Sequence, residues 1–264
     1  MGSGGVMATG SEPPAPPAPQ QPRTLKPLLA QARAELTLTA KRGESVLLAL
    51  GIPVMLLVFF STVDVLPTGR RHPVDFLAPG VLALAVMSTA MVSLGIATGF
   101  ERQYGVLKRL GSTPLGRPAL LAAKTVTVLV VEAVQVVVLV AAALLLGWHP
   151  GGSVVAAAGA MLLATVGFAG VGLLMAGTLR AETVLAAANG LYLVLLLLGG
   201  MVVPLAKLPA ALRKLARVLP AAALSDLLHA GLGVAGRIPA RAWVVLAGWA
   251  IVAPVTAAAT FRWE

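Results

Sequence analysis

Long apolar runs without charge alternate with short basic stretches along most of the chain. A helix needs about 20 apolar residues to cross the hydrocarbon core of a bilayer. Six runs meet this need, at residues 45–63, 76–99, 121–148, 152–179, 183–206 and 242–261. All lack charge except 121–148, which contains Lys124 and Glu132. The pattern therefore predicts an all-α integral membrane protein with six transmembrane helices.

Composition agrees with this prediction, since 58% of the residues are hydrophobic and 11% are charged, against roughly 25% charged residues in ordinary soluble domains. The formal net charge of +10 suits either nucleic acid or an anionic membrane surface. Because the basic residues are separated by apolar runs of membrane length, membrane lipid is the favoured partner and nucleic acid is not expected. The chain has no cysteine, which excludes disulfides and thiolate metal sites.

The remaining segments predict surface elements. Residues 1–22 are rich in Pro, Gly and Ser and predict a disordered tail before a transmembrane domain at 23–264. Residues 25–44 alternate basic and apolar positions, as in a helix lying along the membrane surface. Residues 207–233 predict two short helices, either an external pair that dips into the membrane or an ordinary amphipathic loop. Three prolines punctuate this region: Pro204, Pro209 and Pro220.

An even number of spans places both termini on one side of the membrane. With the termini in the cytoplasm, twelve of the twenty basic residues are cytoplasmic and eight are outside. This excess agrees with the positive-inside rule and predicts a multi-pass protein of the cell membrane with both termini cytoplasmic.

Residues 100–113 are the most charged stretch and predict an amphipathic helix after the second span. Gly111 and Pro114 are expected to end this helix. Its candidate binding residues are Glu101, Arg102, Tyr104, Leu107, Lys108 and Arg109. The pattern alone fits either a docking helix for a soluble partner or a basic loop that only fixes topology.

The order of residues in this stretch resembles the segment after the second span in permeases of the type-2 ABC exporters, including actinobacterial drug and antibiotic exporters. The similar residues are Glu101, Arg102, Gly105, Leu107, Lys108, Leu110, Thr113, Pro114 and Leu115, followed by Leu120, Leu121 and Lys124. The run GGMVVP, two LP pairs around a basic helix, and then LSDLL also resemble the family's segment before its last span. The resemblance covers about residues 25–264.

The resemblance implies a six-helix permease that exports a hydrophobic or amphipathic molecule. It further implies pairing with a second copy or a related six-span permease, and with a separate ABC ATPase subunit that carries ATP and Mg²⁺. Residues 100–113 would then be the coupling helix that docks on the ATPase, and residues 25–44 the connecting helix. The pair at 207–233, with Pro204, Pro209 and Pro220, would form an external gate.

The residues agree with what the resemblance implies, a transport subunit that has no cofactor of its own and is not an enzyme. None of the six lysines follows a glycine, so the phosphate-binding GxxxxGK[ST] loop cannot occur. His72, His149 and His229 lie singly, without the spacing of a metal or catalytic site. No catalytic or metal residues are therefore predicted.

Three polar residues inside the spans are candidates for a substrate path: Glu132, Gln135 and Asn189. A carboxylate in hydrocarbon costs about 2.5 kcal/mol or more unless it is protonated, hydrated or paired. Glu132 is thus either a polar contact for a cationic or amphipathic cargo or, the favoured interpretation, part of an interhelical hydrogen bond. Asn189 could equally line a lumen or form a hydrogen bond with a neighbouring helix. The alternative functions are a proton-coupled transporter that uses Glu132 and a membrane-embedded enzyme acting on lipid.

Overall fold

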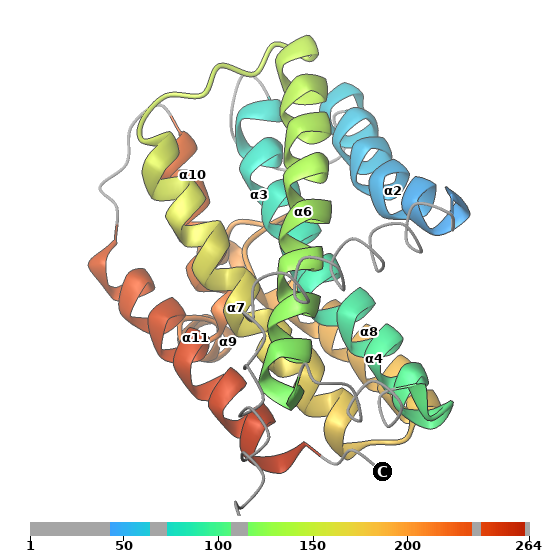
Figure 1. Ribbon diagram of the computed structural model, residues 1–264. Helices are drawn as coiled ribbons and strands as arrows, with labels where there is room; N and C mark the ends of the chain where they lie inside the picture. Colours follow the sequence, from blue (N-terminus) through green and yellow to red (C-terminus); the bar gives the residue numbers. More distant parts are fainter. Residues whose placement is uncertain (1–42, 64–72, 107–115, 234–238, 262–264) are drawn as a thin grey trace, which may run out of the picture.

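The computed structural model describes residues 43–63, 73–106, 116–233 and 239–261, and all regular structure in these ranges is helical (Figure 1). The helices are α2 (Gly43–Thr62), α3 (Val74–Met87), η1 (Ser88–Ser93), α4 (Leu94–Gln103), α6 (Gly116–Leu145), α7 (Val154–Thr178), α8 (Ala181–Leu198), η2 (Leu205–Lys207), α9 (Ala210–Ala216), α10 (Pro220–Leu232) and α11 (Ala240–Thr260). The all-α prediction is confirmed. The predicted tail at 1–22 lies outside the described residues, as does nearly all of the surface helix at 25–44.

Five described helices are long and apolar enough to cross a membrane, or six if the bent pair α9 and α10 crosses as one. These are Val74–Gln103, Ala123–Leu145, Val154–Thr178, Ala181–Leu198 and Ala240–Thr260. The first span expected from the sequence corresponds to α2, whose apolar part Leu50–Thr62 is shorter. The structure therefore gives five to six spans, and the count of six that begins with α2 stays a prediction.

Two predicted boundaries were wrong, and a left-handed glycine lies at each. The fifth span ends at Leu198 instead of residue 206, shortly before Gly200, whose φ is +70°. Residues 100–103 continue the preceding span, and α4 ends at Gln103 just before Gly105, whose φ is also +70°. Glycine adopts this conformation without the steric cost that a side chain incurs, so it commonly terminates helices. A single helix over 100–113 is thus excluded, and residues 107–113 lie outside the described part.

The span formed by α3, η1 and α4 is the centre of the bundle. Every residue of α3 except Asp75 is buried, and the span packs against α2, α6, α7, α8 and α10. Close approach depends on glycine at several points. A Cβ on Gly80 would lie 1.9 Å from the Met201 carbonyl oxygen, and one on Gly172 would lie 2.6 Å from that of Met91. The middle of the span, η1, is a π-helical segment.

α7 and α11 form the most extensive helix pair, and their axes run parallel (Figure 1). Glycines on α7 meet α11 in ascending order: Gly159 faces Trp243, Gly167 faces Ala250, Gly170 faces Pro254 and Gly177 faces Phe261. Small residues permit such close contacts between membrane helices. The glycine-rich sequence of the fourth span is therefore explained by its packing.

α9 and α10 form the predicted short-helix pair, with axes bent by 85°. α10 is almost fully buried and packs against α3, α7 and α11. Its far end reaches the α6–α7 turn, where the Gly151 N–H donates to the Leu232 carbonyl at 3.2 Å. α10 thus packs inside the bundle, an arrangement distinct from an ordinary surface loop.

Candidate functional site

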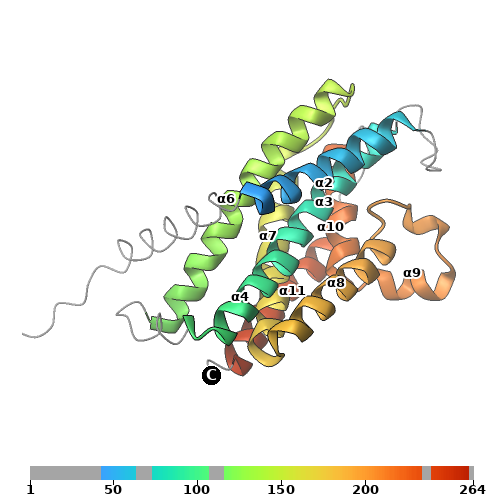
Figure 2. The same ribbon diagram turned by 90° about the vertical axis from the view of Figure 1, so that its right-hand side faces the viewer.

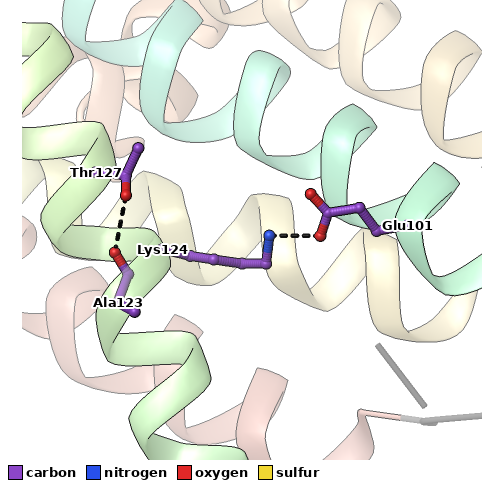
Figure 3. Close-up of polar contacts among 4 residues, drawn as sticks. All are labelled: Glu101, Ala123, Lys124 and Thr127. Atoms are coloured by element: carbon purple, nitrogen blue, oxygen red, sulfur yellow. Dashed lines mark hydrogen bonds and ion pairs between the residues drawn. The ribbon is translucent and has the colours of Figure 1, made fainter. Parts of the chain in front are cut away.

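An ion pair joins the last turn of α4 to α6 (Figure 3). The Lys124 ammonium lies 2.5 Å from a Glu101 carboxylate oxygen. The Lys124 side chain is 3% exposed and that of Glu101 is 32% exposed. A pair that is largely removed from water holds its partners more firmly than a surface pair does. The pair therefore links the end of α4 to α6.

The next two residues of α4 contact the turn between α7 and α8. The Arg102 guanidinium donates to the carbonyl of Leu179, and the Gln103 side-chain amide donates to the Glu182 carboxylate at 2.9 Å. We call Glu101, Arg102 and Gln103, with their partners Lys124, Leu179 and Glu182, the α4 clamp. It ties the end of the central span to three other helices.

Of the remaining predicted docking residues, Tyr104 lies just beyond the clamp. Its side chain is 70% exposed, and its ring stacks on Phe100 with the centroids 6.1 Å apart. Leu107, Lys108 and Arg109 lie outside the described residues. The structure therefore brings Glu101 and Arg102 into contacts within the chain, while Tyr104 is open to solvent or to a partner.

Glu132 lies deep in α6, and its side chain is 5% exposed. The Thr165 hydroxyl of α7 donates to one carboxylate oxygen at 2.5 Å and also contacts the Met161 carbonyl at 2.9 Å. The other oxygen, Oε1, is buried and has no hydrogen-bond partner among the described residues. The interhelical hydrogen bond favoured from the sequence is thus present, and one carboxylate oxygen remains for an additional contact.

Gln135 lies one turn further along α6 and is 2% exposed. Its side-chain oxygen accepts a hydrogen bond from the Thr89 hydroxyl at 2.8 Å. Thr89 lies in the π-helical segment η1. Since π-helical turns are often found at functional sites, the pairing of Gln135 with this turn marks the centre of the bundle as a second candidate region.

Asn189 is separate from these polar contacts. It lies on the exposed face of α8, and its amide donates to the Leu185 carbonyl of its own helix at 2.8 Å. The structure therefore does not bring Asn189 together with Glu132 and Gln135.

The three predicted gate prolines each stand at the start of a helical element. Pro204 precedes η2, Pro209 precedes α9, and Pro220 is the first residue of α10. Proline suits these positions because its missing N–H would have no partner in the first turn. Together the three prolines mark the starts of η2, α9 and α10, through which the chain returns into the bundle.

His229 has a contact that sequence reasoning missed. Its Nε2 lies 2.9 Å from the Phe76 carbonyl of α3 and its Nδ1 lies 2.7 Å from the Ser225 carbonyl. The ring also packs on that of Phe76 with centroids 4.5 Å apart. His229 thus fixes α10 to the central span. No sequence spacing could have revealed this, because residues 76 and 229 are far apart along the chain.

The fold and these contacts define a multi-pass helical membrane protein in which the bent pair α9–α10 and the α4 clamp are separate polar regions. A family model of the ABC-2 type transporter matches residues 28–232, which is most of the chain. The protein belongs to this family and is a membrane subunit of an ABC transporter. Members of the family work with an ABC ATPase subunit and are generally not catalytic themselves. A comparison with curated proteins found no match.

Proposed function

We propose that the chain is the permease subunit of an ATP-driven exporter that moves a hydrophobic or amphipathic molecule, such as an antibiotic, a drug or a lipid-like compound, out of the cell. Membership of the ABC-2 type transporter family supports the transport role. The α4 clamp supports the mechanism, since it lies directly before the basic stretch at 107–115.

The ATPase docks on the segment around Tyr104, Leu107, Lys108 and Arg109, at the cytoplasmic end of the bundle. Closure of the ATPase pulls this segment, and the pull reaches α4 first because α4 ends at Gln103. Glu101 then carries the displacement to α6, and Arg102 carries it to the α7–α8 turn. Small shifts at such a site become larger movements when packed helices have two arrangements.

The translocation path is proposed to run past the polar centre of the bundle toward the α9–α10 gate. The Oε1 atom of Glu132, without a partner among the described residues, provides an acceptor for a cationic or amphipathic cargo. The exposed face of α8 with Asn189 is proposed to face a second permease, either an identical copy or a related six-span protein. ATP and Mg²⁺ are bound by the ATPase, and this chain contributes no cofactor.

The test is reconstitution of the chain with its ABC ATPase partner. The pair should copurify, hydrolyse ATP, and accumulate a lipophilic dye in inside-out vesicles when ATP is added. A Walker-A lysine substitution in the ATPase is the control and should abolish accumulation while leaving the complex intact. Dye movement that follows a proton gradient and does not need ATP would refute the proposal in favour of a proton-coupled transporter.

A further inference from the structure

A cavity of about 400 Å³ lies between α9, α10 and the first turn of α11. Its polar lining consists of three arginines and one acid: Arg213, Arg217, Arg241 and Asp226. Its apolar lining includes Leu205, Ala206, Ala223 and Ala242. The volume falls within the range of about 300 to 1,000 Å³ typical of small-molecule sites. The cavity thus combines an excess of positive charge with apolar walls.

One of the three arginines, Arg241, is held in place by a contact between helices. The Arg241 guanidinium donates to the Arg217 carbonyl at 3.0 Å, and the Trp249 indole N–H donates to the neighbouring Val218 carbonyl at 3.0 Å. These carbonyls follow α9, so α11 caps the C-terminal end of that helix. Asp226 interacts electrostatically with Arg217 and Arg241. One carboxylate offsets only one of three guanidinium charges, which leaves a cavity attractive to an anion.

The cavity is lined by residues that follow the end of α8, whereas the α4 clamp contacts Glu182 at the start of that helix. α8 stops early, and Met201 meets Gly80, which is six residues after the start of α3. Six residues correspond to about 9 Å along a helix. α9 follows at the edge of the bundle away from α6 (Figure 2), with exposed Leu215 and Val218 beside its basic residues. An arginine beside apolar surface is stabilised when its guanidinium reaches the headgroup layer or a bound anion.

We propose that this arginine cavity binds a phosphate-bearing anion, supplied by the headgroup of an anionic lipid in the adjacent leaflet. Guanidinium groups match phosphate oxygens with paired hydrogen bonds. The apolar walls and the exposed Leu215 and Val218 can contact the acyl chains of a lipid. Free phosphate has no apolar part that would bind to these residues. The site stands apart from Glu132 and from the α4 clamp. It lies within the proposed α9–α10 gate, but lipid binding there can be measured without transport.

The neighbouring residues Arg213 and Lys214 provide a matched pair of variants. Both lie on α9 and both carry one positive charge, but only Arg213 lines the cavity. The purified full-length chain is exposed to phosphatidylglycerol or phosphatidylcholine in detergent, and the retained lipid is counted by native mass spectrometry. A parallel arm adds inorganic phosphate as competitor.

The wild type should retain phosphatidylglycerol in preference to phosphatidylcholine. Arg213→Gln should weaken phosphatidylglycerol binding about fivefold, the equivalent of roughly 1 kcal/mol for one basic residue near anionic lipid. Lys214→Gln should leave it unchanged, and Arg217→Gln should act as Arg213→Gln does. An equal loss of phosphatidylglycerol binding in the Arg213 and Lys214 variants would indicate general charge attraction. It would contradict a specific site in the cavity. If inorganic phosphate binds with the same variant pattern and phosphatidylglycerol is not preferred, the lipid assignment is wrong.

Discussion

The Glu101 carboxylate of α4 and the Lys124 ammonium of α6 lie 2.5 Å apart, and the lysine is almost fully buried. Lys124 carries its charge one turn before Val128, where the apolar part of α6 begins. The pair therefore both satisfies the lysine and fastens the helix that precedes the proposed ATPase-binding segment.

Glu101→Gln should destabilise the protein by about 2 kcal/mol, because the buried ammonium loses its carboxylate while the one-third exposed site allows some hydration. Lys124→Met, which removes the buried charge, should recover part of the loss in the double variant. Thermal unfolding of the detergent-solubilised protein gives the stability of the wild type, the two single variants and the double variant, which together form a double-mutant cycle. Strictly additive effects of the two substitutions would contradict a direct pair.

Glu132→Gln should leave folding intact. In the wild type one Thr165 proton is shared between the Glu132 carboxylate and the Met161 carbonyl, and a hydroxyl has only one proton to donate. A glutamine amide can donate to the hydroxyl, which then donates to Met161. If Glu132 contacts cationic cargo, the variant should transport positively charged dyes more slowly and neutral dyes at the same rate. Equal transport of both by the variant and the wild type would leave only a structural role.

Gly170→Ala should separate α7 from α11, since the added Cβ would lie 2.5 Å from the Pro254 nitrogen. Overpacking of this kind commonly costs about 1–3 kcal/mol. Gly190→Ala on α8 is the matched control, because nothing lies within 4 Å of its Cβ position. Thermal unfolding should show a lower midpoint for the Gly170 variant alone. A similar midpoint for both variants would argue against the close α7–α11 contact.

The sequence predicts the apolar helices well because span length and charge exclusion are local properties. α7 and α11 agree with the expected ranges to within two residues at each end. The ends of α4 and α8 were missed because each depends on a glycine in the left-handed conformation, at Gly105 and Gly200. A chain with 28 glycines gives no local sign of which ones adopt it.

The polar contacts were predictable only in part. The depth of Glu132 in an apolar span indicated an interhelical partner, but the identity of Thr165 depends on how α6 and α7 pack. The α4 clamp was not foreseen, because Glu101 and Arg102 were assigned to a surface helix. Their partners, Lys124 and Leu179, lie 23 and 77 residues further along the chain. Such contacts follow from the tertiary arrangement and leave no spacing to detect.

The proposed orientation places Tyr104 in the cytoplasm and α9 outside, on the basis of the basic excess at the terminal side. The chain lacks cysteine, so a thiol reagent can label only the single cysteine that is introduced. Lys214→Cys should react in intact cells with a thiol reagent that cannot cross membranes. Tyr104→Cys, at a side chain 70% exposed, should react only after the membrane is permeabilised. The reverse pattern would invert the topology and would exclude the proposed coupling role of Tyr104.

The double variant Tyr104→Ala, Arg109→Ala tests the coupling segment most directly. Tyr104 is exposed beside the α4 clamp, and truncation of an aromatic or charged residue at the centre of an interface often costs about 2 kcal/mol or more. Binding of the ATPase should therefore weaken by roughly 30-fold, since each 1.4 kcal/mol is a factor of ten in affinity. ATP-dependent export should fall with it.

The matched control for this variant is Lys214→Ala on α9, which also removes an exposed side chain but lies away from the clamp. It should bind the ATPase as the wild type does. Because Tyr104 follows the last residue of α4, the double variant should insert and unfold like the wild type, which separates lost docking from lost folding. Pull-down of the purified ATPase and vesicle transport give the two readouts. Full binding and export by the double variant would refute the docking assignment, and the basic stretch after α4 would then serve only to fix topology.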